Sequence, residues 1–519
     1  MSVANQDSSD SDEGSTKRRK GKRVITMNLT AHCGNYTQMP VRLVLDKIGW
    51  KEVQSADPHF WWIESSQSVH EERYQVLSRA KINYFPKVWE LCRKKGLTRC
   101  LNTFAQLNGS RKLNFFPPTY ILPEDWPEFD QVLHGKCKTF IVKPDAGSQG
   151  AGIYLTRLGA GTDPKLNKAE KAIIQRYIHK PLLVDGLKFD FRVYMLIVSL
   201  EPVRAYVYKD GLARFCTLKY VQPNKANLDS RFAHLTNYSL NKFSATFEHS
   251  DDGTSGSKRR LGVVWEQLDS MGMDSEELWE SVRDMCAQTL LAMLPHAWFS
   301  YNTHVLHTEG HPSCFQLIGV DVLLDHRGRP WLLEINNHPS LNLDEATDRL
   351  VKEPMLAEMF KICRPIFRGK PTPAPAPNSR VTFGEVTQLR ERRLSKGARS
   401  AAIEKNNLEI FEPIFSDAEC SDYHDVCPYV REKFMAAFEY ASRVGERERS
   451  QFLGLSAAKF LKAARMLGAV DDGTSLTSRC DSDLVFIEAT YVTRGALVLV
   501  LVILLLKLLL VLCEGRVRA

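Results

Sequence analysis

Residues 316–343 read QLIGVDVLLDHRGRPWLLEINNHPSLNL, and this stretch has the pattern of a β-hairpin. An apolar run over 317–324 precedes the turn residues 325–330, and a second apolar run covers 331–335. If the hairpin closes symmetrically about Arg327 and Gly328, residue 325 pairs with residue 330. The same register places Asp321 directly opposite Glu334.

Two carboxylates that face each other repel, so the pair needs a compensating cation. A hard cation with oxygen ligands suits it best, and alternation along the second strand places Asn336 on the same face as Glu334. The neighbouring apolar side chains point into the core: Val322, Leu324, Leu333 and Ile335. The hairpin therefore predicts a magnesium site. The alternative is a salt-bridged hairpin with one carboxylate turned to solvent.

The chain has 519 residues, of which 44% are hydrophobic and 25% charged, an ordinary composition for a folded protein with one large core or several domains. Its formal net charge of +8 attracts acidic partners and leaves nucleic acid, acidic lipid and acidic protein tails open. The 12 cysteines form no CxxC pair or regular framework, and no apolar N-terminal segment directs secretion. We expect reduced thiols in the cytosol.

Residues 1–23 join Ser, Asp and Glu to a basic cluster over 17–23, and such an arm cannot bury a core. We expect a disordered, solvated tail, with a nuclear signal as the alternative for the basic cluster.

Order is expected from residue 24, with a strand over 25–31, a helix over 41–48 and a second strand over 59–63. One long amphipathic helix is expected over 85–107, where Arg93, Lys94, Lys95 and Arg99 form a solvated face or reach phosphates.

Residues 139–155 read TFIVKPDAGSQGAGIYL, which is a strand, a glycine-rich loop and another strand. It is not a Walker loop, because Lys143 precedes the glycines and a strand follows them. Glycines let backbone N–H groups approach a polyphosphate, and a lysine from the preceding strand neutralises it. The pattern indicates a different phosphate grip, and a flexible hairpin is the alternative.

Residues 188–194, KFDFRVY, alternate strictly between polar and apolar side chains. The apolar segment 195–200 follows, which favours a central strand facing a polar cleft over an exposed edge strand. A hairpin is expected from 203–208 and 212–216 around the two-residue turn Asp210-Gly211, and it presents Arg214 to the same cleft. With α/β elements throughout, the order of elements indicates an open sheet that encloses a nucleotide cleft.

From about residue 24 to 367 the chain resembles the tubulin tyrosine ligase-like enzymes, a branch of the ATP-grasp fold. The blocks that carry the resemblance occur in the family's order: KPDAGSQGAGI (143–153), QRYIHKPLL (175–183), KFDFRVY (188–194), HLTNYSLNK (234–242), and GVDVLLD with WLLEINNHPSL (319–325 and 331–341). The resemblance implies an α/β ATP-grasp fold with an N-terminal α/β domain, followed by a mainly helical C-terminal extension.

The resemblance also implies roles for individual residues. Phosphates are contacted by Lys94 and Lys143, with Gln149 and Gly150 in the loop. The adenine pocket is lined by Gln175, Tyr177 and Ile178, and the nucleotide is held by Lys188 and Asp190, with His234, Thr236 and Asn237 completing the site. Arg192 and Arg214 act on the γ-phosphate and the acceptor carboxylate, and magnesium is held by Asp321, Glu334 and Asn336. The catalytic set is Arg192, Arg214 and Glu334.

The implied chemistry is the ATP-dependent joining of an amino acid to a side-chain carboxylate through an acyl phosphate. Glutamate-adding members are most similar, which implies tubulin or microtubules and free glutamate as partners and no nucleic acid. Ala151 departs from the pattern, since many relatives carry a basic residue there, and this leaves glycylation or tyrosination open. A catalytically weak microtubule-binding adaptor is the rival interpretation. The implied location is the cytoplasm and cytoskeleton, including the cilium or basal body.

Beyond the resemblance, a Pro-rich linker over 368–380 precedes a basic helical extension over 381–470. Its basic helix over 381–405 is either a solvated face or a segment that docks on acidic microtubule tails. A linker over 471–495 leads to an apolar segment, 496–513, which is long enough to span a bilayer as a tail anchor. Lys507 in its middle is costly in a membrane, and an altered C-terminal end is the alternative.

Overall fold

The computed structural model describes residues 29–33, 39–54, 58–63, 80–107, 113–145, 150–159, 166, 171–200, 202–305, 314–364, 401 and 404–415. The helices are α1 (Met39–Lys47), α3 (Val88–Cys92), α4 (Lys94–Leu107), α5 (Trp126–Leu133), α6 (Arg231–His234), α7 (Tyr238–Asn241), α8 (Leu261–Ser270), α9 (Ser275–His304) and α10 (Ala346–Ile362). The predicted arm 1–23, the linker 368–380, the linker 471–495 and the apolar segment 496–513 lie outside the described residues.

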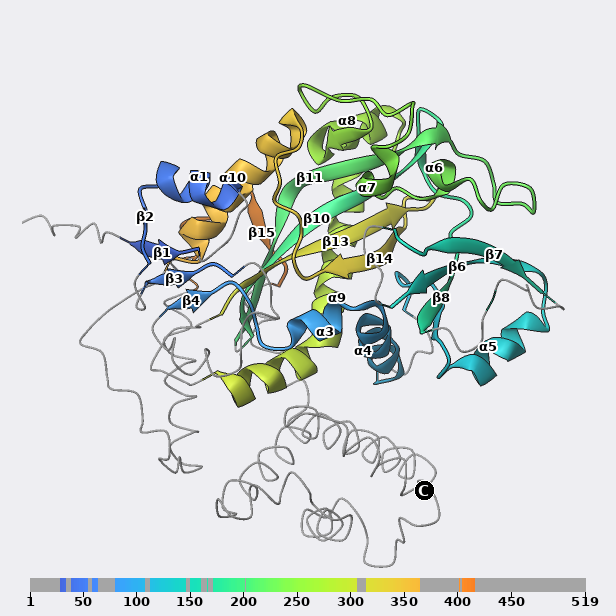
Figure 1. Cartoon of the computed structure of the whole chain (residues 1–519), viewed down its shortest axis with the longest axis horizontal. Helices are drawn as coiled ribbons and strands as arrows, with labels where there is room; N and C mark the ends of the chain where they lie inside the picture. The colour runs from blue at the N-terminus through green and yellow to red at the C-terminus, as the bar shows by residue number, and fades with distance from the viewer. Residues whose placement is uncertain are drawn as a thin grey trace, which may run out of the picture.

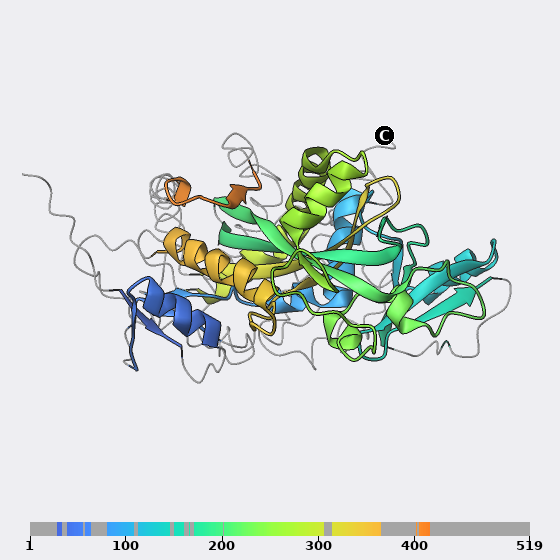
Figure 2. The same cartoon turned by 90° about the horizontal axis from the view of Figure 1, so that it is seen from above.

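Three sheets lie side by side, with the largest in the middle (Figures 1 and 2). The four-stranded N-terminal sheet is parallel and consists of β1 (Thr30–His32), β2 (Lys51–Glu52), β3 (Phe60–Trp61) and β4 (Lys81–Ile82). The central seven-stranded sheet consists of β9 (Leu183–Val184), β10 (Leu187–Leu200), β11 (Val203–Lys219), β12 (Lys258–Arg260), β13 (Gln316–Leu324), β14 (Pro330–Asn336) and β15 (Phe411–Pro413). The third sheet is four-stranded and antiparallel, with β5 (Thr119–Ile121), β6 (Lys138–Pro144), β7 (Tyr154–Leu158) and β8 (Ala172–Arg176). The mixed α/β class is therefore confirmed.

The long strand β10 separates two hydrophobic cores because its side chains alternate. Its odd-numbered side chains from Phe189 to Ile197 pack in a core with residues of α3, α4, α8 and α9. Its even-numbered side chains from Tyr194 to Val198 pack in a second core with residues of α1 and α10. The second face continues into the polar residues at 188, 190 and 192, of which Lys188 and Asp190 line a pocket between the central sheet and the third sheet.

The β13–β14 hairpin confirms that Asp321 lies opposite Glu334, although the hairpin closes differently from the prediction. Leu324 pairs with Pro330, so the loop also contains Asp325 and is one residue longer than the symmetric closure requires. A β-bulge between Asp321 and Val322 then restores the expected register at Glu334. The bulge turns Leu332, rather than the predicted Leu333, into the core, and Leu333 lines the pocket instead.

Two local predictions are wrong. The stretch 85–107 is not one helix, because Arg93 has an extended backbone that ends α3 before α4 begins. The expected hairpin around Asp210 and Gly211 does not form, because β11 runs through both residues and pairs with β10 along its length. A register shift lets Val193 pair with Gly211 and Tyr194 pair with Tyr208, so the strand absorbs the extra residues as a bulge.

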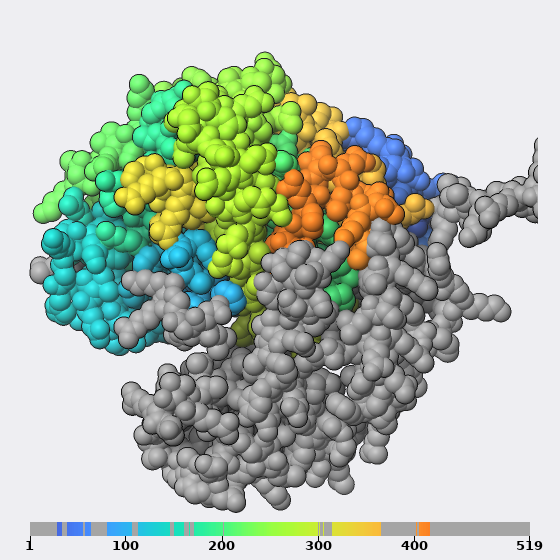
Figure 3. Space-filling model, turned by 180° about the vertical axis from the view of Figure 1, so that it is seen from behind, coloured from blue at the N-terminus to red at the C-terminus, as the bar shows by residue number. Residues whose placement is uncertain are grey.

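A segment after the linker returns to the central sheet, which the sequence patterns did not indicate. We call residues 404–415 the strap. Its strand β15 pairs with β11 along Tyr206 to Tyr208, and the buried Glu404 forms an ion pair with Arg204, with Oε2 2.9 Å from Nε. Figure 3 shows this segment in orange against the neighbouring helices. The part of the predicted helical extension that is described therefore contains a sheet strand.

No helix within the described ranges is both long and apolar enough to cross a membrane. The candidate membrane segment 496–513 lies outside those ranges, as does most of the basic helix predicted over 381–405.

Candidate active site

A row of charged side chains crosses three neighbouring strands of the central sheet. Asp190 on β10 lies opposite Arg214 on β11, and Arg192 on β10 lies opposite Asp321 on β13. Arg214 donates Nε to Asp190 Oδ1 at 2.7 Å, and its Nη2 lies 2.8 Å from Asp321 Oδ2. Arg192 donates Nε to Asp321 Oδ1 at 2.5 Å. Each carboxylate in this row is therefore neutralised by a guanidinium.

The facing carboxylates Asp321 and Glu334 have opposite electrostatic environments. Burial disfavours both charges, but the adjacent Arg192 and Arg214 hold the pKa of Asp321 far below its usual range. Burial, followed by the charge of Asp321, raises the pKa of Glu334. Among the described residues, the only hydrogen-bond donor to the Glu334 carboxylate is Asn336 Nδ2, 3.5 Å from Oε1. Glu334 thus has no ion pair among the described residues, and the charges of Lys143, Lys94 and Arg192 only partly offset the effects of burial and of Asp321 on its pKa.

This arrangement fits a divalent cation with oxygen ligands. The candidate donors are the Glu334 carboxylate, the Asn336 amide oxygen, and lone pairs of Asp321 that its arginines leave open. No group of three or more His, Cys, Asp or Glu side chains that could hold a metal occurs in the described part of the chain. The candidate set is therefore two carboxylates and an amide, which suits magnesium better than a metal that prefers nitrogen or sulfur ligands.

The third sheet contributes a buried lysine to the opposite wall of the pocket. Lys143 on β6 donates Nζ to Gln175 Oε1 at 2.9 Å and to the Leu333 carbonyl oxygen at 3.2 Å. Burial lowers the pKa of Lys143 to about 8, although the nearby Glu334 opposes the shift. Gln175 is fixed in turn by donating Nε2 to Thr119 Oγ1 at 2.9 Å. The lysine is therefore held in place at the pocket without a carboxylate within ion-pair distance.

A second buried lysine stands at the other end of the pocket. Lys188 donates Nζ to the His234 carbonyl oxygen at 2.6 Å and to the Tyr177 hydroxyl at 3.2 Å. Burial and the charge of Lys188 lower the pKa of His234 to about 4, so this imidazole is neutral near pH 7. Thr236 donates its hydroxyl to Asp190 in a short hydrogen bond. The HLTN segment is thus bound to the charged strand β10.

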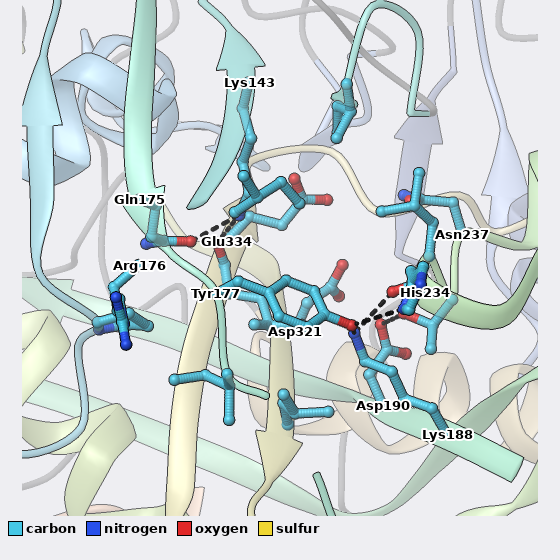
Figure 4. A pocket seen from close by; sticks show the side chains of 18 residues that line it. Lys143, Gln175, Arg176, Tyr177, Lys188, Asp190, His234, Asn237, Asp321 and Glu334 are labelled. Atoms are coloured by element: carbon cyan, nitrogen blue, oxygen red, sulfur yellow. Dashed lines mark hydrogen bonds between the residues drawn. The ribbon is translucent and has the colours of Figure 1, made fainter. Parts of the chain in front are cut away.

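Many of these side chains line a pocket of about 610 Å³, including space open to solvent, and Figure 4 shows Lys143, Tyr177 and Glu334 among them. It brings together most of the residues assigned from the sequence: Lys143, Gln175, Tyr177, Ile178, Lys188, Asp190, His234, Thr236, Asn237, Asp321 and Glu334. Sequence reasoning missed Arg176 and the apolar walls formed by Pro117, Ile141, Ile153, Leu235, Leu323 and Leu333. The only sequence signal for Arg176, Leu235 and Leu333 is that each lies next to an assigned residue in the chain. The alternation pattern had placed Leu333 in the core.

The assigned residues Arg192, Arg214 and Asn336 are not among those that line the pocket: the two arginines belong to the charged row, and Asn336 ends β14. Three assigned residues remain. Lys94 begins α4, and its positive charge contributes to the pKa of both Lys143 and Glu334, so it lies near them. Gly150 has a positive φ of 82°, and a Cβ there would lie 3.3 Å from Asn237 Oδ1, which brings the end of the loop to the HLTN segment. Gln149 lies outside the described residues.

A buried ion cluster supports the loop that follows β14. Asp348 on α10 accepts from Lys258 at 2.8 Å and lies 2.8 Å from Lys352 Nζ. Lys352 also donates to the Asn342 carbonyl oxygen at 2.6 Å. The cluster therefore joins α10 to β12 and to the loop after β14.

The model of the tubulin-tyrosine ligase family matches residues 70–372, more than half of the chain and all of the site just described. The chain belongs to this family. Tubulin-tyrosine ligase family proteins with similar sequences include human tubulin polyglutamylase TTLL13, 38% identical over 367 residues, which covers 69% of this chain and 43% of that protein. Tubulin polyglutamylase TTLL6 of Mus musculus is 39% identical over 342 residues, covering 66% of this chain and 40% of that protein.

Human tubulin polyglutamylase TTLL7 is 35% identical over 363 residues, covering 67% of this chain and 40% of that protein. The chain therefore spans less than half the length of these relatives in the tubulin-tyrosine ligase family.

Proposed function

We propose that the chain is an ATP-dependent ligase of the ATP-grasp type that adds glutamate to side-chain carboxylates of tubulin tails. The observation that carries the proposal is that one pocket holds both the buried Lys143 of one sheet and, on another sheet, the carboxylate of Glu334, which has no ion pair among the described residues. A triphosphate needs cations on one side and a metal site on the other, and this pocket offers both. The naming of three similar proteins as tubulin polyglutamylases supports the choice of substrate.

In the proposed reaction, an acceptor carboxylate oxygen attacks the γ-phosphorus of ATP and ADP leaves. The resulting acyl phosphate is attacked by the α-amine of glutamate, an amide bond forms, and phosphate leaves with the amine proton passing to solvent or a base. Asp321, Glu334 and Asn336 would hold magnesium, which supplies positive charge for the transferred phosphoryl group. Arg192 and Arg214 are buried, permanently charged and fixed by carboxylates, so they stabilise developing negative charge without reorganising.

Positioning accounts for the rest of the proposed catalysis. Lys143 and Lys188 stand at separate points of the pocket wall and contact different parts of the nucleotide, with Lys143 at its phosphates. The apolar walls at Ile141, Ile153 and Leu333 exclude water from the acyl phosphate, which hydrolysis would otherwise consume. The neutral His234 adds no charge to the nucleotide site and serves as a hydrogen-bonding group.

The test uses the full chain with ATP, magnesium and microtubules, and supplies labelled glutamate, glycine or tyrosine one at a time. The intact mass of the tubulin tails is then measured. Additions of the glutamate residue mass with the wild type and none with Glu334→Gln support the proposal. Incorporation of glycine or tyrosine assigns a different ligase of the family. Microtubule binding without incorporation of any amino acid favours the adaptor interpretation.

The proposal places the protein at microtubules of the cytoplasm and cytoskeleton, and at the cilium or basal body.

The basic segment over 381–405 is a further proposed contact with acidic tails. Charge reversal at Arg392 and Arg393 then weakens microtubule affinity most strongly at low salt. Equal affinity of this variant and the wild type at low salt would contradict that contact.

A further inference from the structure

A cluster of basic side chains, which includes three arginines and a lysine, lies at the surface beside the pocket. We call it the cationic ridge, and its members are Arg176, His179, Lys180, His326, Arg327 and Arg329. They come from two segments far apart in sequence, the end of β8 with the residues after it and the turn between β13 and β14. The His326 N–H donates to the Lys180 carbonyl at 2.9 Å, and the Leu182 N–H donates to the Leu324 carbonyl at 2.8 Å. Backbone pairing therefore fixes the two segments together.

The turn that carries half of the ridge is rigid. Asp325 Oδ1 accepts from the backbone N–H groups of Arg327 and Arg329 at 2.9 and 3.2 Å, and its Oδ2 accepts from Trp331 Nε1 at 3.0 Å. Gly328 has a φ of 80°, and a Cβ there would lie 2.6 Å from Leu278 Cδ2 on α9, so the turn packs closely on that helix. The cations are thus displayed in a fixed arrangement.

The charges of the ridge are not compensated. In the described part of the chain, no carboxylate forms an ion pair with its arginines or with Lys180. The nearest acid, Asp325, is occupied by the turn. Burial, followed by the charges of Arg176, Lys180 and His326, lowers the pKa of His179, which agrees with their closeness. Like charges held together repel one another, so an anionic partner that binds here relieves the repulsion.

The ridge adjoins the wall of the pocket at Arg176, whose guanidinium lies over the Phe140 ring, 5.7 Å from its centroid, on the opposite face of β8 from Gln175. Arg176 lies between Gln175 and Tyr177, lines the pocket, and has a buried Nη1 without a hydrogen-bond partner in the described residues. Lys180, His326 and Arg327 are exposed, and the yellow β13–β14 turn reaches the surface beside the cyan third sheet in Figure 3. An anionic chain along the ridge would therefore lie on the protein surface outside the part of the pocket that Gln175, Tyr177 and Ile178 line.

We propose that the cationic ridge is a docking surface for an acidic polypeptide, the chain that carries the acceptor carboxylate. The inference rests on the proposed function, because that function supplies an acidic acceptor. Separate charges spread over two segments suit a chain with several carboxylates better than a single phosphate group. The fixed backbone of the two segments lowers the entropy lost on binding.

The experiment compares the full chain with two double variants that change the charge equally. Lys180→Glu with Arg327→Glu alters the ridge, and Lys51→Glu with Arg364→Glu is the matched control. Both control residues are exposed and form no ion pair among the described residues, and they lie on β2 and after α10, near the N-terminal sheet. Binding of a fluorescent glutamate-rich peptide is measured by anisotropy over a range of salt, and the KM values for that peptide and for ATP are measured separately.

We expect the ridge variant to raise the Kd and KM for the peptide about tenfold at low salt, with kcat and the KM for ATP within about twofold of wild type. The control should stay within about twofold for every quantity. Equal weakening in both variants would mean general charge attraction and would overturn the proposal. A rise confined to the KM for ATP would assign the ridge to the nucleotide. If the wild type bound a single-stranded oligonucleotide more tightly than the peptide, the ridge would be assigned to nucleic acid.

The binding measurement separates this inference from the proposed function. If the wild type binds the peptide through the ridge but incorporates no amino acid, the proposed ligase activity fails and the docking surface stands. If the wild type incorporates glutamate but the ridge variant binds and reacts like wild type, the docking surface fails and the activity stands.

Discussion

Asp321 and Glu334 face each other across neighbouring strands, yet only Asp321 is bound by arginines. The pair is therefore asymmetric. Asp321 is ionised at any ordinary pH, whereas burial and the charge of Asp321 both oppose ionisation of Glu334. A cation that binds between them would stabilise the folded protein, since it removes the repulsion that the apo site retains.

The first prediction concerns this pair. Glu334→Gln should leave the unfolding temperature of the magnesium-free protein unchanged or higher, because it removes an unfavourable charge, and should abolish the rise in unfolding temperature that magnesium produces in the wild type. Asp321→Asn should instead lower the unfolding temperature without magnesium, because it leaves two buried guanidinium groups without their shared carboxylate, a change of about 3 kcal/mol. Thermal unfolding with and without magnesium measures both effects. An equal magnesium response in Glu334→Gln and wild type would contradict the metal assignment.

The second prediction is a pH dependence from Lys143. Its pKa is lowered to about 8, so the free protein carries this cation below pH 8 and loses it as the pH rises toward 9. ATP affinity, measured by calorimetry from pH 6.5 to 9.5, should therefore fall above pH 8. Lys143→Arg should remove this dependence, because arginine stays charged throughout the range. His234, with a pKa of about 4, contributes no titration there. A profile in Lys143→Arg that matches wild type would assign the loss to another group.

Much of the site follows from local patterns. The alternation in KFDFRVY is sufficient to place Asp190 and Arg192 on one face, because strand geometry requires it. The pairing of Asp321 with Glu334 is correct, but the hairpin reaches that register through a bulge that no local rule specifies. The same limit explains Leu333, whose side chain changes face because of the bulge.

Other features depend on contacts between distant segments. Asp210-Gly211 has the composition of a hairpin turn, but β11 forms a longer ladder with β10 if it continues through these residues. Within β11, Asp210 accepts a hydrogen bond from Nη2 of Arg260 on β12 at 2.7 Å. The helix over 85–107 breaks at Arg93 despite its continuous amphipathic pattern. The strap is the clearest case, since its pairing with β11 joins residues about two hundred positions apart, and short sequence windows carry no signal for such a contact.

The third prediction tests the glycine-rich loop. Gly152 has a φ of 70°, and a Cβ there would lie 2.9 Å from Pro144 Cγ. Gly152→Ala should therefore lower the free energy of unfolding by about 1 kcal/mol or more and raise the KM for ATP, because the end of the loop must move. Gly262→Ala in α8 is the matched control, since nothing lies within 4 Å of its Cβ. It should be neutral or stabilise the protein by up to about 1 kcal/mol. Both free energies come from denaturant unfolding, and equal effects of the two substitutions would contradict the prediction.

The last prediction concerns the strap, which lies beyond the family match at residue 372. Glu404 is buried and joined to Arg204 and to the Tyr206 hydroxyl, whereas Glu409 in the same segment is exposed and pairs with the exposed Lys361. Glu404→Gln should cost about 3 kcal/mol, because it leaves Arg204 charged and buried, and Glu409→Gln should cost less than about 1 kcal/mol.

The strap also covers an edge of the central sheet. Glu358 on α10 accepts from the backbone N–H groups of Glu409, Ile410 and Phe411, so the strap joins α10 to β11, the strand that carries Arg214. A chain that ends after residue 372 should therefore unfold at a lower temperature and aggregate more readily than one that ends after 415, because the edge of β11 is left unpaired. A synthetic peptide of residues 401–415 should restore part of the difference by adding a strand to that edge. Equal unfolding temperatures of the two shortened chains would mean that the central sheet does not need the strap for its stability. Wild-type stability of Glu404→Gln would show that the ion pair between Glu404 and Arg204 does not hold the strap in place.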